Sequence, residues 1–280
     1  MPVTENLLLF LKRFVMKIAL IQLDTVWESK TANYARAEKF FKKAAREACD
    51  VIVFPEMFDT GFSMNISVFG EDEKGETASV LSGLAKKYGL NVIAGFAAKT
   101  LGRKKAKNLA VVFGRSGSVI ANYAKMRPFA FADEDKYFSA GNSSVVFPIE
   151  GVPASVFICY DLRFPELFRE VAREIRMIFV IANWPERRKD HWETLLKARA
   201  IENQCFVIGV NRTGKDGNGI RYPGASHVYG PTGKDICAGG PREQFVACEI
   251  DPEEVTKVRH RFPFLDDMRP CSNIPASAKK

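Results

Sequence analysis

The sequence predicts an α/β protein built from two β-sheets covered by helices. Three observations support this fold class: short apolar runs that end at turn residues recur along the chain, amphipathic segments at helical spacing lie between them, and no internal repeat or linker divides the 280 residues. Because strands and helices mix throughout the chain, two covered sheets are favoured over a pure barrel. The length suffices for one large core, and we expect a single domain over residues 16–280.

The first residues stand apart from this pattern. Residues 1–15 contain a short apolar patch but lack the basic start and the small-residue cleavage site of a signal peptide. The run that begins at Met16 alternates into a first strand. We therefore interpret residues 1–15 as an extension, disordered or produced by a misplaced start, that lies outside the fold. No apolar run approaches the length of a transmembrane helix.

Strands and helices are expected in a definite order. Apolar runs bounded by turn residues predict strands at residues 17–24, 50–56, 91–98, 108–113, 118–124, 145–148, 155–158, 177–181, 205–210, 225–229 and 245–250. Helical spacing predicts helices at residues 34–48, 77–88, 165–175 and 190–203, and a last short one after residues 251–254. Residues 126–142 are too polar and broken for a regular element, and glycines make residues 214–219 a flexible loop.

Composition narrows the classes of function. The formal charge is +8, but lysines and arginines are scattered among acids, and the dense run at residues 103–107 is typical of a solvated hairpin loop. We therefore expect no nucleic-acid partner, while a mildly basic surface suits a small anionic substrate. The six cysteines show no Cys-x-x-Cys pair and no regular spacing. This argues against a zinc site or a disulfide framework and favours the reducing cytoplasm.

One segment carries the strongest chemical signal. The apolar run at residues 156–158 delivers Cys159 to a sharp polar turn, and a helix-compatible segment opens at Pro165. Reacting groups of open α/β sheets collect at such strand ends, although a free cysteine is more commonly a buried structural residue. Two other strands end on Glu56 and Lys125. A carboxylate can take the thiol proton and an ammonium can stabilise a developing oxyanion, so the three residues suffice for acyl transfer.

The segments around these residues resemble the nitrilase, or carbon-nitrogen hydrolase, superfamily. Glu56 in FPEMFDTGF, Lys125 in YAKMRPF and Cys159 in ICYDLRFPE match its three signature segments in order and spacing, and the resemblance covers roughly residues 17–265. It implies a four-layer αββα sandwich in which Glu56 is the general base, Lys125 stabilises the tetrahedral intermediate and Cys159 is the nucleophile. Glu134 in ADEDKYFSAGN matches a second family glutamate, which positions the lysine and the substrate.

Two further segments resemble the omega-amidase branch of this superfamily. They are ANWPERRKDHWETLLKARAIENQ and NRTGKDGNGIRYPGAS, and the branch hydrolyses the ω-amides of 2-oxoglutaramate and 2-oxosuccinamate. The resemblance implies ammonia release from a small anionic amide through a thioester, with no metal or organic cofactor. Residues 126–129 depart from the branch, which commonly has a histidine shortly after the lysine. Nitrilase, N-carbamoyl hydrolase and deaminated glutathione amidase reactions stay open, as does a non-catalytic interaction protein on the same fold.

Substrate contacts are expected beside the three motifs. The candidates are Tyr160, whose backbone N–H would share the oxyanion with Lys125, and Phe62, Phe129, Arg127, Arg163 and Trp184. An arginine can hold a substrate carboxylate bidentately. A Cys-His hydrolase is the mechanistic alternative, because three histidines are present, but none of them closes a strand as Glu56 does.

The helices after the nucleophile carry a further expectation. The resemblance implies a homodimer that pairs through these helices. Arg199 and Glu202 lie three residues apart on the predicted 190–203 helix, where an ion pair or a subunit contact is expected.

Overall fold

The computed structural model describes residues 15–99 and 102–269, which form two six-stranded sheets. The first sheet has the spatial order β14 (Gln244–Ile250), β1 (Met16–Gln22), β2 (Val51–Val53), β3 (Asn91–Ala98), β4 (Lys107–Phe113) and β5 (Val119–Ala124). The second has the order β13 (Asp235–Ala238), β12 (His227–Tyr229), β9 (Phe206–Asn211), β8 (Met177–Ala182), β7 (Val152–Ile158) and β6 (Phe147–Ile149).

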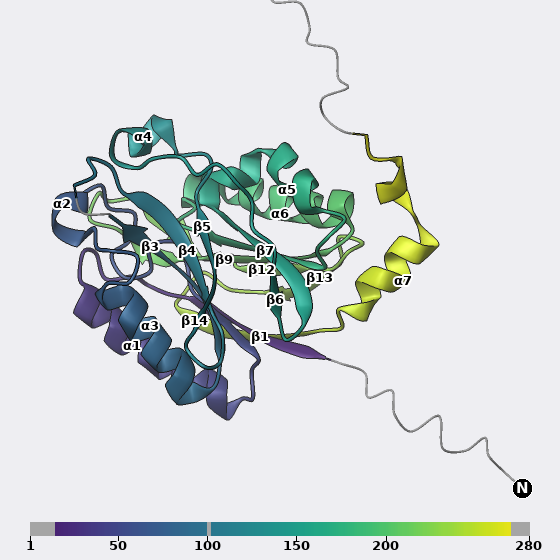
Figure 1. The fold of residues 1–280 in the computed structure, drawn as a ribbon, viewed down its shortest axis with the longest axis horizontal. Coiled ribbons are helices and arrows are strands. Elements are labelled where there is room, and N and C mark those ends of the chain that lie inside the picture. The colour runs from purple at the N-terminus through teal and green to yellow at the C-terminus, as the bar shows by residue number, and fades with distance from the viewer. Residues whose placement is uncertain (1–14, 100–101, 270–280) are drawn as a thin grey trace, which may run out of the picture.

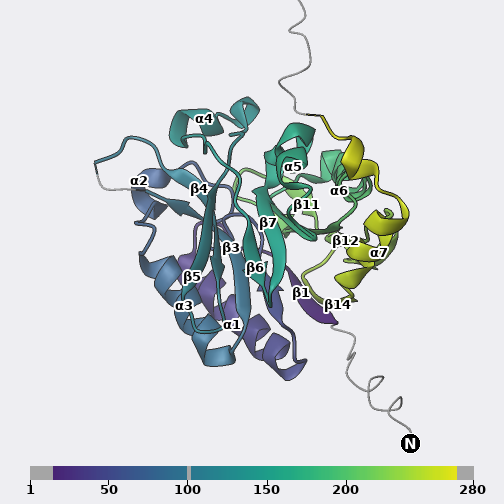
Figure 2. The same ribbon diagram turned by 45° about the vertical axis from the view of Figure 1, so that its right-hand side comes forward.

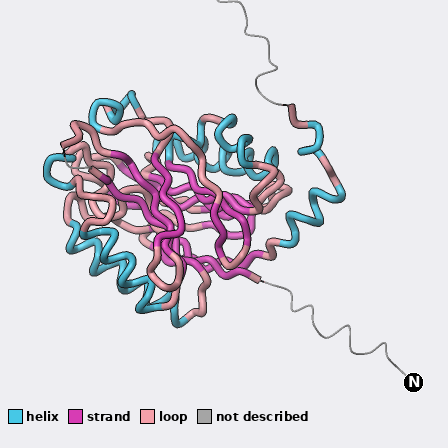
Figure 3. The backbone as a smooth tube through the Cα atoms, viewed as in Figure 1, coloured by secondary structure: helices cyan, strands magenta, loops and turns pink. Residues whose placement is uncertain are grey.

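Helices cover the outer faces of both sheets (Figure 1). The first sheet is covered by α1 (Lys30–Arg46) and α3 (Glu76–Tyr88), and the second by α5 (Pro165–Val171) and α6 (Lys189–Asn203). The turned view separates these four layers (Figure 2), and the tube shows the strands gathered between the helices (Figure 3). The predicted αββα sandwich is therefore confirmed. No helix in the two described ranges is long and apolar enough to cross a membrane.

Strand β1 shows why the sequence folds in layers. Ile18 and Leu20 are fully buried in the apolar cluster between the sheets, whereas Ala19 and Ile21 are fully buried in the cluster beneath α1 and α3. Successive side chains of a strand point to opposite faces of the sheet. A strand covered on both faces is therefore apolar at successive positions rather than at alternate ones.

The structure differs from the predicted elements mainly in short segments. The predicted irregular stretch 126–142 contains a 3-10 turn (Ala130–Ala132) and α4 (Glu134–Tyr137), and the predicted loop 214–219 lies in a hairpin of β10 (Thr213–Lys215) and β11 (Arg221–Pro223). Strand β13 and helix α2 (Ile66–Phe69) were not predicted, because four residues are too few to show a period. Helix α5 ends at Val171, before the predicted residue 175, and α7 (Glu253–Arg261) is the predicted last helix.

The expectation that residues 1–15 form an extension outside the fold is not tested. Apart from Val15, residues 1–15 lie outside the described residues.

Gly95 in β3 allows the first sheet to approach the segment that follows β2. A Cβ atom at this position would lie 2.9 Å from Glu56 Cα and 2.9 Å from Met57 N. Two main-chain bonds already join the segments, since Phe58 N–H donates to Gly95 O at 2.9 Å and Gly95 N–H donates to Pro55 O at 3.3 Å. A side chain here would push Glu56 away from the sheet.

We expect Gly95→Ala to lower the free energy of unfolding by about 2 kcal/mol or more, because overpacking against backbone cannot be relieved by a rotamer change. The matched control is Gly83→Ala on α3, where an added Cβ meets nothing within 4 Å. That change should raise stability by about 0.5–1 kcal/mol, the usual gain from alanine in a helix. Urea unfolding of both variants measures the difference, and equal stability of the two would contradict it.

Candidate active site

The ends of four strands bring three of the predicted catalytic residues together with an asparagine. Glu56 follows β2, Lys125 follows β5, Cys159 follows β7 and Asn183 follows β8. The first two strands belong to one sheet and the last two to the other. The site therefore lies where the two sheets meet at one edge, which no single sheet could provide.

Lys125 lies between two carboxylates. Its Nζ donates to Glu56 Oε1 at 2.9 Å and to Glu134 Oε2 at 2.8 Å. Glu56 and Glu134 are fully buried and Lys125 is 1% exposed. Burial by itself lowers the pKa of Lys125, but the carboxylates of Glu134 and Glu56 outweigh it and hold that pKa well above its ordinary value. The ammonium therefore stays charged. It has three N–H donors. The third bond goes to Glu134 Oε1 at 3.1 Å, a carboxylate that Lys125 already binds, so this N–H can turn to another acceptor without the loss of either glutamate.

Two asparagines that sequence reasoning missed complete this cluster. Asn108 Nδ2 donates to Glu56 Oε1 at 2.6 Å and to Glu134 Oε1 at 2.8 Å, so one amide group bridges both glutamates. Asn183 donates from its backbone N–H to Glu56 Oε2 at 2.9 Å and from its side chain to Glu56 O at 2.7 Å. The only sequence signal for Asn183 is the break that ends its strand. Asn108 has none, because it lies inside the predicted strand 108–113.

Cys159 lies on a strained turn at the end of β7. Its φ of 46° falls in the left-handed region, which residues with a Cβ seldom adopt. The thiol donates to Asn183 O at 3.8 Å. Burial and then the Glu56 carboxylate raise the pKa of Cys159 well above its ordinary value, and Lys125 offsets only part of this effect. The thiol is therefore protonated at neutral pH, and its proton must leave during attack rather than before it.

Asp161 connects the cysteine turn to the lysine segment. This fully buried carboxyl group accepts from Ile158 N at 3.1 Å, just before Cys159, and from Arg127 N at 2.8 Å, two residues after Lys125. The Tyr123 hydroxyl, on β5, donates to it at 2.8 Å. Burial raises the pKa of Asp161 to about 7, although Lys125 opposes the effect. One carboxyl group thus holds together main-chain segments from different sheets.

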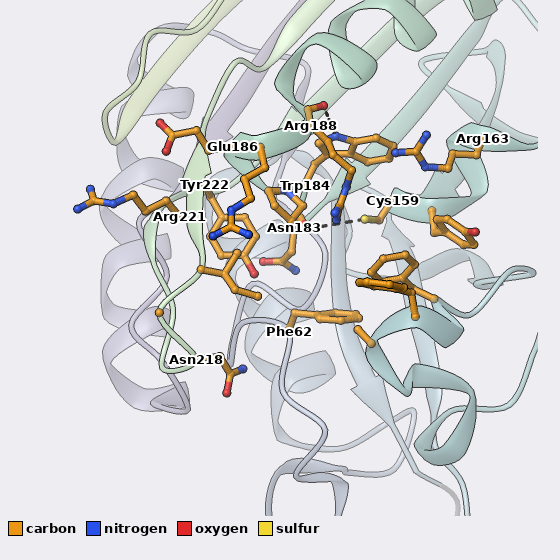
Figure 4. Close-up of a pocket in the computed structure, with 18 of the residues that line it drawn as sticks. Phe62, Cys159, Arg163, Asn183, Trp184, Glu186, Arg188, Asn218, Arg221 and Tyr222 are labelled. Atoms are coloured by element: carbon orange, nitrogen blue, oxygen red, sulfur yellow. Dashed lines mark hydrogen bonds between the residues drawn. The ribbon is translucent and has the colours of Figure 1, made fainter.

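A cavity of about 510 Å³ opens over the thiol (Figure 4). Lys125, Cys159 and Asn183 line its floor, while Glu56 and Glu134 are buried behind Lys125 and do not line it. Aromatic side chains form much of its wall: Phe62, Phe129, Tyr160, Trp184 and Tyr222. The Phe129 ring lies 4.8 Å from that of Tyr160, and Lys125 Nζ lies 5.3 Å from the Phe62 ring.

The structure places five of the six predicted substrate contacts in the cavity lining and one outside it. Phe62, Phe129, Tyr160, Arg163 and Trp184 all line the cavity. Arg127 is not among the lining residues: its Nη2 lies 3.5 Å from Glu166 Oε1, and its guanidinium packs 5.3 Å from the Phe164 ring. The placement of Arg127 as a substrate contact is thus not supported, because an existing carboxylate already binds its charge.

Two of the three histidines make contacts that do not involve the thiol. His191 Nδ1 lies 3.2 Å from Arg163 Nη2, and His227 Nδ1 lies 2.9 Å from Ala225 O. Neither bond involves the thiol, which favours the glutamate over a histidine as its base. The predicted ion pair of Arg199 and Glu202 is confirmed at 2.9 Å on α6.

The family model described as carbon-nitrogen hydrolase matches residues 17–260. The chain belongs to the carbon-nitrogen hydrolase family. The protein is therefore a hydrolase that acts on carbon-nitrogen bonds.

Individual proteins that are similar to this carbon-nitrogen hydrolase have more specific descriptions than the family. A 2-oxoglutaramate amidase of Bacillus subtilis (strain 168) is 37% identical over 256 residues, which is 90% of this chain and 97% of the relative. An omega-amidase of Escherichia coli (strain K12) is 32% identical over 255 residues, 90% of this chain and 96% of the relative. The solved structure of a CN-hydrolase superfamily protein from Xanthomonas campestris, with an arsenic adduct in its active site, superposes with a TM-score of 0.87 at 30% identity, covering 92% and 98% of the two chains.

We expect Asp161→Asn to lower kcat by roughly 10–100-fold while KM changes by less than about threefold. An asparagine presents an N–H group on one side of its amide, so a main-chain N–H of Ile158 or Arg127 would lose its acceptor and the cysteine turn would shift relative to Lys125. Steady-state kinetics with any amide that the protein hydrolyses measures the effect.

The control is Asp59→Asn, which alters another buried carboxyl group. Asp59 accepts from the Thr77 hydroxyl at 3.0 Å and lies 3.5 Å from Lys30 Nζ, away from both segments that Asp161 joins. This variant should lose stability but keep kcat within about threefold. A similar loss of kcat in both variants would mean that Asp161 acts only through general stability.

The two buried carboxyl groups also predict a pH dependence of stability. Burial raises the pKa of Asp59 to about 6 and that of Asp161 to about 7, against about 4 in an unfolded chain. Each group binds its proton more tightly in the folded state, so each weakens the fold as the pH rises from about 4 through its folded pKa. Asp59→Asn should therefore reduce the change in unfolding free energy between about pH 5 and pH 7.5 by roughly 1–3 kcal/mol.

Urea unfolding at the two pH values measures this change. The exposed substitution Glu170→Gln serves as the control and should leave the wild-type slope intact. An Asp59→Asn variant with the wild-type slope would show that Asp59 titrates alike in the folded and unfolded states.

Proposed function

We propose that this protein is a cysteine-dependent amidase that releases ammonia from the ω-amides of short 2-oxo dicarboxylic acids, of which 2-oxoglutaramate is the first choice. The observation that carries this function is a protonated thiol at the floor of a cavity, which the Lys125 ammonium also lines. Burial and then the Glu56 carboxylate raise the pKa of that thiol, and Glu56 also binds Lys125. The names of the Bacillus subtilis and Escherichia coli relatives support the choice of acyl group.

The first half of the reaction forms a thioester. Glu56 accepts the Cys159 proton while Sγ bonds to the amide carbon, and the carbonyl oxygen becomes an oxyanion. The third N–H of Lys125 and the backbone N–H of Tyr160 donate to that oxygen. The carbon-nitrogen bond then breaks, and the leaving nitrogen takes the proton from Glu56 and departs as ammonia.

The second half returns the enzyme to its starting state. A water molecule gives a proton to Glu56 as its oxygen bonds to the thioester carbon, and the same two donors stabilise the second oxyanion. The carbon-sulfur bond breaks, the acid leaves, and the thiolate recovers the proton from Glu56. Glu134 acts by holding Lys125 in place, since its Oε2 also accepts from Phe129 N at 2.5 Å and is thereby fixed to the cavity wall.

The test is ammonia release by the purified protein from 2-oxoglutaramate, compared with glutamine, a simple nitrile and an N-carbamoyl amino acid. We expect the 2-oxo acid amide to be preferred, and we expect Cys159→Ala to lose at least about 10⁴-fold in kcat because no nucleophile remains. Circular dichroism of the variant checks that the fold is intact.

The other outcomes are equally clear. Turnover of another compound in the panel would keep the glutamate, lysine and cysteine mechanism but replace the acyl group. Turnover that survives in Cys159→Ala would refute the nucleophile. A wild-type protein that is silent on deaminated glutathione as well as on the panel would favour a non-catalytic interaction protein on this fold. The homodimer stays a prediction of the family resemblance, the single domain a prediction from chain length, and the cytoplasmic location a prediction from the cysteine spacing.

A further inference from the structure

Four arginines line the cavity. Arg187 is exposed, and the other three differ in what their guanidinium groups touch. Arg163 Cζ lies 4.8 Å from the Trp184 ring, and its Nη2 bonds to His191. Arg221 is exposed at the rim, and its guanidinium points away from the cavity (Figure 4). Arg188 extends into the cavity toward Cys159 in the same view. Arg188 is therefore the arginine best placed to meet a molecule bound at the thiol.

Both polar groups of the Arg188 backbone, its N–H and its carbonyl, form hydrogen bonds. Its N–H donates to Pro185 O at 3.0 Å, and its carbonyl accepts from Trp184 Nε1 at 2.7 Å. The guanidinium lies 5.5 Å from the Phe129 ring. The side chain therefore starts from an ordered turn, just before α6, and lies along an aromatic wall that limits its directions.

Neither Arg188 nor Arg163 has a carboxylate partner. Within the ranges 15–99 and 102–269, no Asp or Glu oxygen lies within 4.0 Å of either guanidinium, whereas Arg127, Arg115 and Arg199 each bind one. Burial and then the Arg188 charge lower the pKa of Arg163. Two guanidinium groups beside an aromatic wall repel one another. An anion that binds between them is attracted by both positive charges and offsets this repulsion, so its binding is favourable.

We propose that Arg188 binds the carboxylate of the substrate and thereby selects anionic over neutral amides, with Arg163 as a second positive charge behind it. This inference rests on the proposed amidase function and adds the residue that selects the substrate. The amide end of the molecule lies at Cys159 and Lys125, the carboxylate end lies at Arg188, and Phe62, Phe129 and Tyr160 pack against the short chain between them. Arg127, which the sequence offered for this role, is bound to Glu166 instead.

The experiment compares Arg188→Gln with Arg221→Gln, since each removes one positive charge from the same cavity region. The substrates are 2-oxoglutaramate and pentanamide, a neutral amide of the same chain length. For Arg188→Gln we expect kcat/KM to fall on the order of 100-fold for the anionic amide and to change less than about threefold for the neutral one. Arg221→Gln should leave both values within about threefold of the wild type.

A second measurement avoids turnover. Iodoacetamide alkylates the thiol, and 2-oxoglutarate, as a product-like anion, should slow the alkylation of Cys159 in the wild type and in Arg221→Gln. In Arg188→Gln, protection should need on the order of 100-fold more of the anion. Arg188→Lys should fall between the two variants, because it keeps the charge and loses the bidentate geometry.

Several results would overturn the inference. An equal loss on both amides would make Arg188 a structural residue, and an equal effect of Arg221→Gln would reduce its role to long-range charge. If the wild type ignores 2-oxoglutaramate, the proposed function fails, and the same comparison is made with succinamate and butanamide. Preference of the wild type for the neutral amide of that pair would then refute the role of Arg188 as well.

Discussion

The ammonium of Lys125 between two buried carboxylates is the interaction on which the site depends. Removing three charged groups from water is costly, and such a cluster is stable only when every partner is present with good geometry. Here Asn108, the Asn183 backbone and the Phe129 N–H satisfy most of the remaining carboxylate oxygens. Segments from both sheets must therefore converge at this point, because the loss of any one would leave a charge buried without its partner.

The same cluster explains the state of the nucleophile. Burial disfavours a thiolate, which would also add a further negative charge beside Glu56, so the pKa of Cys159 is raised and the thiol keeps its proton. In the proposed mechanism, the proton then moves to the adjacent carboxylate while the new negative charge moves to the substrate oxygen, to which Lys125 donates. The strained turn at Cys159 holds the sulfur toward the cavity, and Asp161 maintains that turn against the lysine segment.

The charged groups at the cavity differ in whether they are paired. Two carboxylates and one ammonium bind one another at and behind the floor, whereas Arg163 and Arg188, which also line the cavity, have no carboxylate within 4.0 Å among the described residues. A molecule with a neutral amide at one end and a carboxylate at the other matches this division in one orientation only. The reversed orientation would place its carboxylate near Glu56 and Glu134, where repulsion between like charges opposes binding. With the proposed role of Arg188, electrostatics as well as shape would set the orientation of the substrate.

The sequence by itself determined the layered fold and the positions of Glu56, Lys125 and Cys159, because apolar runs that stop at an ionisable residue are local patterns. It also placed Glu134, through the resemblance of its flanking segment. Only the tertiary structure decided which polar residues complete the site. Asn108 and Asn183 bind Glu56 across 52 and 127 residues of chain, and no local period encodes such contacts. The sequence offered Arg127 and Arg163 for the substrate carboxylate, and only the tertiary structure shows that Glu166 binds Arg127 and that Arg188 lines the cavity. A charge is available to a ligand only when no carboxylate from elsewhere in the fold already binds it.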